Sequence, residues 1–219
     1  MDTFAASVLL ADARFPAGGY AHSGGVEPAH GSGAVSDLAA LELFLRGRLR
    51  TSGVTAAGLA AAACDPRADW AALDAEADAR MPSPAQRDAS RRQGRALLRA
   101  ARAAWPQAGH LGEVGAGQPG AGQPGTGPHH AVVLGAAAAA AGCQPRHAAG
   151  IAAYQSVSGP ASAAVRLLGL DPIAVNAIVA RLAGEIDEIA WEGLPFPSAP
   201  NLDLLAEVHT TAEVRLFES

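Results

Sequence analysis

The sequence predicts an all-α protein, a multi-helix bundle, and three observations indicate this fold class. Of the 219 residues, 49% are hydrophobic but only 5% are aromatic, and alanine supplies most of the hydrophobic share. Alanine has the highest helix propensity and buries little area, so helices that meet through alanine and glycine must pack closely. Apolar residues recur at three- and four-residue spacing, and no convincing strand alternation is found. A chain of this length can form one sizeable core, and we expect a single domain over residues 1–219.

The first half of the chain contains five expected helices. Residues 3–13 form the first. The pair Ser36-Asp37 fits the N-cap of a second helix, because the leucines that follow it share one face. These are Leu38, Leu41, Leu45 and Leu49. The alanine-rich residues 54–64 are expected to form a third helix. Asp65-Pro66 starts a fourth, which runs to about residue 80. Residues 85–105 show the strong helical pattern of a fifth.

The second half continues the helical pattern after residue 130. The apolar run 131–142 predicts a helix that is too short to span a bilayer, which takes about 20 residues. Residues 146–158 and 160–168 are expected to form two helices, because Ser158-Gly159-Pro160 should separate them. An amphipathic helix starts at Asp171-Pro172, and a short helix follows from Leu202.

Residues 106–128 interrupt this pattern. The segment GAGQP at 115–119 is repeated at 120–124. So little apolar surface cannot offset the entropy of ordering the backbone, and we expect a flexible Gly/Gln/Pro-rich loop.

Charge and cysteine content exclude several classes of protein. The net charge of −5 gives no general affinity for nucleic acid. Cys64 and Cys143 lack the paired spacing of a disulfide framework or zinc site. The chain opens with Met1-Asp2 and no basic region, unlike a signal peptide, so we expect a cytoplasmic protein without a membrane segment.

The most informative stretch is an N-terminal turn, residues 15–27, in which two glycine pairs bracket the sequence YAHS. Glycine pairs permit positive φ, so a tight turn is expected at both pairs, and a valine at Gly19 should strain it. Ser23 is expected to cap a short helix with Glu27 near its positive end.

Three chemical interpretations of the N-terminal turn compete, and the residue types exclude the first. A phosphate-binding loop requires a lysine, and the sequence contains none. A small serine hydrolase would use Ser23, His22 and Glu27, but Ala21 replaces the first glycine of the Gly-x-Ser-x-Gly pattern. The third interpretation is a turn between helices without chemistry of its own, which the residue types favour.

Histidine and arginine patterns give two further alternatives. A direct nickel carrier would draw on His22, His129, His130 and Cys143, although adjacent histidines cannot share one helix face. The helix over residues 85–105 carries an arginine stripe, which is either a solvated face or a docking face for an acidic partner. The stripe consists of Arg87, Arg91, Arg95, Arg99 and Arg102.

The N-terminal stretch LADARFPAGGYAHSGGVE (residues 10–27) resembles the signature of the UreF family of urease accessory proteins. Further blocks resemble the same family: ASRRQGRALL at 89–98, AVVLG at 131–135 and AAVRLLG at 163–169. The C-terminus matches through His209, Arg215, Leu216, Phe217 and Ser219.

The resemblance implies an α-helical, dimeric adaptor without a reaction or cofactor of its own, since nickel is handled by the whole complex. Such proteins bind UreD (also called UreH), recruit the GTPase UreG, and take part in inserting nickel into apo-urease. It implies partner-facing positions in the N-terminal turn at Gly18, Gly19, Tyr20, His22, Ser23, Gly24, Gly25 and Glu27. Arg215, Leu216 and Phe217 become candidates for a C-terminal segment that orders on binding, and Arg95 is a further candidate for partner contact.

Overall fold

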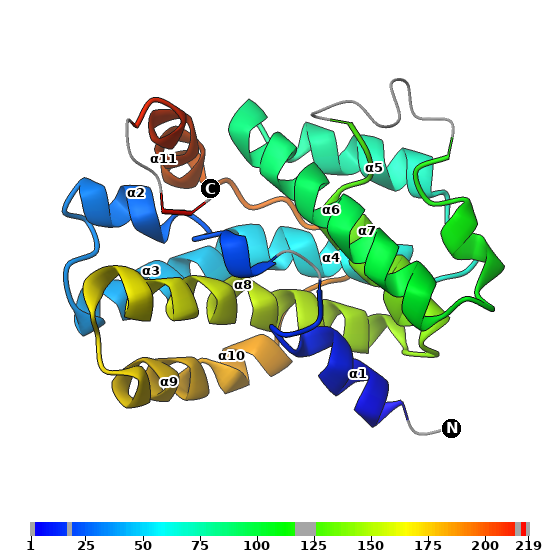
Figure 1. Cartoon of the computed structure of the whole chain (residues 1–219), viewed down its shortest axis with the longest axis horizontal. Helices are drawn as coiled ribbons and strands as arrows, with labels where there is room; N and C mark the ends of the chain where they lie inside the picture. The colour runs from blue at the N-terminus through cyan, green and yellow to red at the C-terminus, as the bar shows by residue number, and fades with distance from the viewer. Residues whose placement is uncertain (1–2, 17–18, 117–125, 213–215, 218–219) are drawn as a thin grey trace.

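The structure, a computed structural model, describes residues 3–16, 19–116, 126–212 and 216–217, apart from the side chain of Tyr20. The regular elements over these residues are helices and helical turns, which confirms the predicted all-α class (Figure 1). The longer helices are α1 (Phe4–Ala11), α3 (Leu38–Arg48), α4 (Val54–Ala63), α5 (Trp70–Ala79), α6 (Pro84–Ala104), α7 (His130–Ala140), α8 (Pro145–Leu168), α9 (Pro172–Arg181) and α11 (Pro200–Thr210). The shorter elements are η1 (Gly19–Ala21), α2 (Val26–Gly31), η2 (Leu49–Gly53), η3 (Gly109–Gly112) and α10 (Ala183–Asp187).

Helix α8 runs through the middle of the molecule and packs against α3, α4, α7 and α9 (Figure 1). Its N-terminal half shares one hydrophobic cluster with α4, α6 and α7, to which it contributes Ala148, Ile151 and Ala152. Its C-terminal half shares a second cluster with α2, α3 and α9. Helix α8 is therefore the element that joins the two parts of the core.

Helices α4 and α7 approach closely, as the alanine content predicts. A Cβ atom added at Gly135 of α7 would overlap the carbonyl oxygen of Ala60 and lie 2.6 Å from Cβ of Ala63. Both alanines are fully buried on α4. A side chain larger than a hydrogen at position 135 does not fit between these helices.

The prediction of two helices between residues 146 and 168 is wrong, because α8 is continuous from Pro145 to Leu168 with Pro160 inside it. Proline lacks the N–H that would bond the carbonyl of residue i−4, which here is Ser156. Nε of Arg48 donates to that carbonyl at 2.9 Å instead. A neighbouring element thus satisfies the backbone group that usually makes a proline break a helix.

Other boundaries also differ from the expectations. A π-helical turn, η2, joins α3 directly to α4, where the sequence suggested a gap between two helices. Helix α5 begins at Trp70 rather than at Pro66, because the side chain of Asp69 accepts the backbone N–H of Ala72 and caps it there. The amphipathic stretch after Asp171 divides at Leu182 into α9 and α10.

Part of the segment expected to be a flexible loop is packed. Leu111 and Val114 are buried in the core next to the helical turn η3. Arg102 donates from Nε to the carbonyl of Leu111 at 3.0 Å. The expectation is therefore wrong for this part of 106–128, while residues 117–125 lie outside the described part of the chain.

Within the described residues, none of the helices combines the length and the apolar character that crossing a bilayer demands.

Candidate partner-docking site

Among the described glycines of the two pairs, those of the second pair have the backbone conformation that favours glycine. Gly24 has φ of +58° and Gly25 has φ of +90°. Gly19 does not have a positive φ and has open space where a Cβ would go, so the expected strain of a valine at Gly19 is not supported. Gly25, rather than the predicted Ser23, is the N-cap residue of α2.

Glu27 joins the N-terminal turn to the far end of the chain. Its Oε1 accepts the backbone N–H of Leu216 at 2.7 Å, and its Oε2 accepts that of Phe217 at 2.9 Å. The carboxylate is 14% exposed. A charged acceptor that holds two successive backbone donors fixes both the position and the direction of Leu216 and Phe217.

Two further side chains hold Phe217. Nε2 of His209, on α11, lies 3.1 Å from the carbonyl oxygen of Phe217 and 3.5 Å from Oε2 of Glu27. The guanidinium of Arg166, on α8, lies over the Phe217 ring at 4.3 Å from its centroid, within cation–π range. We call Glu27, Arg166, His209, Leu216 and Phe217 the composite surface.

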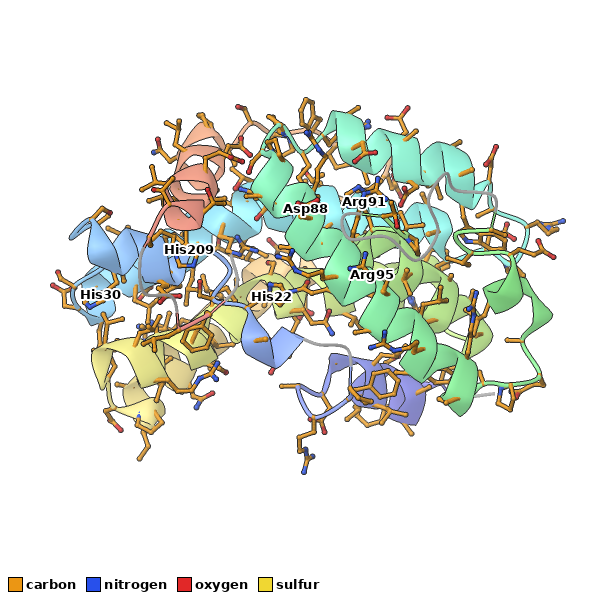
Figure 2. The ribbon with its side chains drawn as sticks, turned by 45° about the horizontal axis from the view of Figure 1, so that its top comes forward. His22, His30, Asp88, Arg91, Arg95 and His209 are labelled. Carbon is orange, nitrogen blue, oxygen red and sulfur yellow. The ribbon has the colours of Figure 1, made fainter. Side chains whose placement is uncertain are left out.

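The structure thus brings together the two regions that the sequence analysis proposed separately. Figure 1 shows α11 beside α2, and Figure 2 shows His209 close to the α2 end of the molecule. Gly18 and Arg215 lie outside the described residues, and for Tyr20 only the backbone is described, in η1.

His22 and Ser23 face inward rather than toward a partner. Ser23 is fully buried, and His22 is 9% exposed. His22 lies between α6 and α8 (Figure 2), where it lines two cavities together with His130. Their proposed contact with a partner stays a prediction, and their positions give them a packing role beneath the N-terminal turn.

The geometry does not support a serine hydrolase. The Ser23 hydroxyl is buried without a hydrogen-bond partner, so no base activates it. The Glu27 carboxylate is engaged by the backbone of Leu216 and Phe217, and the imidazole beside it is that of His209 rather than His22. A nucleophile that is neither exposed nor hydrogen-bonded to a base lacks both requirements for acyl transfer.

The four residues considered for a nickel carrier do not gather into a group of three or more potential ligands. In the described part of the chain, such a group is formed by Asp74, Asp78 and His129. His130 faces the cavities, where burial and then the nearby charge of His22 lower its pKa to about 4. Cys143 is buried beside Cys64, whose pKa burial raises to about 12.

The group of Asp74, Asp78 and His129 is already occupied by a cation of the chain itself. Arg91 bridges both carboxylates, from Nη1 to Asp74 at 2.9 Å and from Nη2 to Asp78 at 2.6 Å. The imidazole of His129 joins Asp78 at 2.9 Å on one side and the Ser90 hydroxyl at 3.0 Å on the other. Burial raises the pKa of Asp78, but the His129 hydrogen bond and the Arg91 charge outweigh it and lower that pKa. This ion-pair network joins α5, α6 and the start of α7.

The arginine stripe is therefore not simply a solvated face, because most of it binds the chain's own backbone. Arg95 donates to the carbonyl of Thr126, and Arg87 donates to that of Met81 at 2.7 Å. Figure 2 shows Arg91 and Arg95 on α6. Contact between Arg95 and a partner stays a prediction.

Sequence reasoning did not single out Arg48 or Arg166. The contacts that give these arginines their roles, Arg48 with Ser156 and Arg166 with Phe217, join residues more than 50 positions apart. Helical periodicity does not reveal such contacts. A signal was available for the ion-pair network, because Asp74 and Asp78 are four residues apart and share one face of α5.

Comparisons with known proteins agree with the fold and with the motifs. A sequence model of the UreF family matches residues 35–183. A protein of Mycolicibacterium vanbaalenii named urease accessory protein UreF is 45% identical over 225 aligned positions that cover both chains completely. Proteins of the same name from Mycobacterium marinum and Mycobacterium tuberculosis are 44% and 43% identical, again over the full length of both chains.

Proposed function

Because the chain belongs to the UreF family of urease accessory proteins, we propose that it is a helical adaptor that binds UreD (UreH) and recruits the GTPase UreG. In this proposal the assembly inserts nickel into apo-urease and couples GTP turnover to nickel delivery. The chain acts as a homodimer in the cytoplasm and catalyses no reaction of its own.

The observation that supports this proposal most strongly is the pairing of Glu27 with the backbone of Leu216 and Phe217. Leu216 and Phe217 follow Glu27 by 189 and 190 positions in the sequence, yet the three residues form one surface. Leu216 and Phe217 were expected to order on binding, whereas here Glu27 already holds them in the free chain. A surface that is shaped before the partner arrives binds more tightly, because ordering a free segment on binding reduces the affinity.

Exposed apolar side chains lie on the composite surface and next to it. Leu216 is 72% exposed, and Leu204 and Val208 on the neighbouring helix α11 are each 65% exposed. Leu204 and Val208 are four residues apart and so share one face of α11. Large apolar side chains that a folded protein leaves in water are typical of sites that a partner covers. We assign this face to UreD (UreH).

The experiment measures the affinity of the full chain for purified UreD (UreH) from the same organism, with wild type and Glu27→Gln. An amide can accept one of the two backbone N–H groups, but it points its NH₂ at the other. The loss of one hydrogen bond to a charged group corresponds to roughly tenfold weaker binding.

Glu188→Gln is the matched control, because Glu188 is exposed at the end of α10 and lies outside the composite surface. It should bind like wild type. If wild type forms no complex with UreD (UreH), the adaptor function is wrong. If Glu27→Gln binds as tightly as wild type, the composite surface is not the docking site.

A further inference from the structure

Arg48 lies between two other segments of the chain, α8 and the N-terminal turn. It is the last residue of α3, where the helix changes to the π-helical turn η2. Its Nε donates to the carbonyl of Ser156 at 2.9 Å, the group that Pro160 leaves without a helical donor. Turns of this kind are often found at functional sites.

The second glycine pair of the N-terminal turn packs against the Arg48 guanidinium. A Cβ added at Gly24 would lie 3.3 Å from Cζ of Arg48 and 2.7 Å from Cγ of Pro160. Because φ of Gly24 is +58°, both the backbone conformation and the space favour glycine there. The glycine in the family motif thus lets the turn close over the charged group.

The charge of Arg48 has no carboxylate partner among the described residues. Burial alone lowers its pKa to about 10, and no acidic group nearby raises it. Its neighbours on the same segment differ in this respect, because Arg46 and Arg50 both pair with Glu185, each at 2.8 Å. Arg48 is half-buried, and a cation partly removed from water without a counter-charge is costly unless something else neutralises it.

Two cavities of about 240 Å³ and 200 Å³ share Arg48 in their walls. Arg166 also lines the first cavity and Arg80 the second. Among the described residues in these walls, Asp12 is the carboxylate, and Arg14 already holds it at 2.7 Å. His130, with its low pKa, is neutral at pH 7. Arg80 is paired with Glu76, so the positive charge that both cavities share is that of Arg48.

We propose that Arg48 forms a binding site for a carboxylate at the place where the two cavities meet. With Nε engaged by Ser156, the end of the guanidinium presents Nη1 and Nη2, a planar pair of donors that matches the two oxygens of a carboxylate. Gln93 lines both cavities and supplies an amide as a further donor. Cavities of this size are smaller than the ~300–1,000 Å³ that drug-sized ligands occupy, so the ligand is small.

This carboxylate comes from one of two sources, a free small carboxylate ion or the side chain of an aspartate or glutamate of a protein partner. The chemistry at Arg48 is the same for both. The site itself does not depend on the adaptor role, so it can be tested on the isolated chain.

The test follows thermal unfolding of the full chain at pH 7 with 100 mM sodium acetate, against sodium chloride at the same ionic strength. We expect a Kd on the order of 1–10 mM, because two charge-assisted hydrogen bonds form without a large buried area. Acetate should then raise Tm by about 3–11 °C relative to chloride. An equal Tm in the two salts overturns the proposal.

Three variants assign the acetate effect to Arg48. Arg48→Gln should abolish the shift, and Arg48→Lys, which keeps the charge but loses the planar pair, should reduce it at least by half. Arg50→Gln is the matched control and should keep the full shift, because Arg50 faces Glu185 outside the cavities. If circular dichroism shows that Arg48→Gln does not fold, the acetate-dependent shift in Tm is compared between wild type, Arg48→Lys and Gln93→Leu instead. A full shift in the variants of Arg48 and Gln93 overturns the proposal.

A second measurement identifies the source of the carboxylate once the Arg48-dependent shift is seen. The affinity for UreD (UreH) is determined in the same two salts. Tenfold weaker binding in acetate identifies a partner's acidic side chain as the ligand, and equal binding identifies a free carboxylate. Because the thermal shift requires no partner, its failure is distinct from a failure of the adaptor function.

Discussion

Replacing Gly135 by alanine tests the close approach of α4 and α7 that the alanine content predicts. The added Cβ would overlap the carbonyl oxygen of Ala60 and lie 2.6 Å from Cβ of Ala63, whereas carbon atoms normally approach to about 3.5–4.0 Å. The two helices must therefore separate by about 1 Å, a distance that forfeits a quarter to a half of the dispersion energy of each contact across the interface.

We expect Gly135→Ala to lower the free energy of unfolding by about 2 kcal/mol. Overpacking a buried interface costs about 1–3 kcal/mol, and this site is near the upper end because backbone as well as side-chain atoms obstruct the methyl group. The higher helix propensity of alanine returns up to about 1 kcal/mol. For a chain of this length, Tm should fall by about 4–8 °C.

Gly150→Ala is the matched control, because Gly150 lies inside α8 and has open space where its Cβ would go. Only the propensity gain applies there, so the free energy of unfolding should rise by about 0.5–1 kcal/mol. Urea denaturation of both variants with unchanged m-values checks the pair. A Gly135→Ala protein at least as stable as wild type would refute the close packing of α4 and α7.

Two further predictions concern buried charges. Arg91→Met should destabilise the chain by about 3 kcal/mol in urea denaturation, because the side chains of Arg91 and Asp74 are 12% and 7% exposed and the two carboxylates lose the cation that bridges them. The exposed Arg99, changed to methionine, should cost less than about 0.5 kcal/mol. Equal effects of the two substitutions would disprove the network's role. Burial, followed by the charge of His22, lowers the pKa of His130 to about 4, so the unfolded chain binds this proton more readily than the folded chain does. The stability that depends on neutral His130 is complete above about pH 6.5 and is lost as the pH falls toward 4. At pH 5 the loss is about 1–2 kcal/mol, because the partial exposure of His130 to solvent moderates the effect. Urea denaturation at pH 7 and pH 5 should show a smaller loss for His130→Gln than for wild type, and identical losses would contradict this assignment.

The helices could be predicted from the sequence because their patterns are local. Leucines at helical spacing, capping residues and alanine-rich runs identify most elements within a few residues of their ends. Pro160 gave the wrong prediction, since the rule that proline ends a helix assumes that the freed carbonyl has no other donor. Arg48, which supplies that donor, is 108 positions away from Ser156.

The candidate site could be predicted only in part. The family motifs pointed to the N-terminal turn and the C-terminus, but no sequence pattern indicated that Glu27 binds the backbone of Leu216 and Phe217. Both glycine pairs looked equivalent in sequence, whereas Gly24 and Gly25 have positive φ and Gly19, the described member of the first pair, does not. Arg91 belonged to a stripe that suggested solvent or a partner, yet it bridges two carboxylates of α5. Such contacts depend on how the helices meet, which a periodic pattern does not encode.

The most direct test of the central claim, that this chain is an adaptor needed for urease maturation, measures nickel content and urease activity in cells of the source organism. Cells that lack this chain but retain UreD (UreH), UreG and the urease subunits should contain urease protein with little nickel and little activity. Re-expression of the wild-type chain should restore both, and Glu27→Gln should restore them incompletely. Fully active, nickel-loaded urease in cells without the chain would contradict the account.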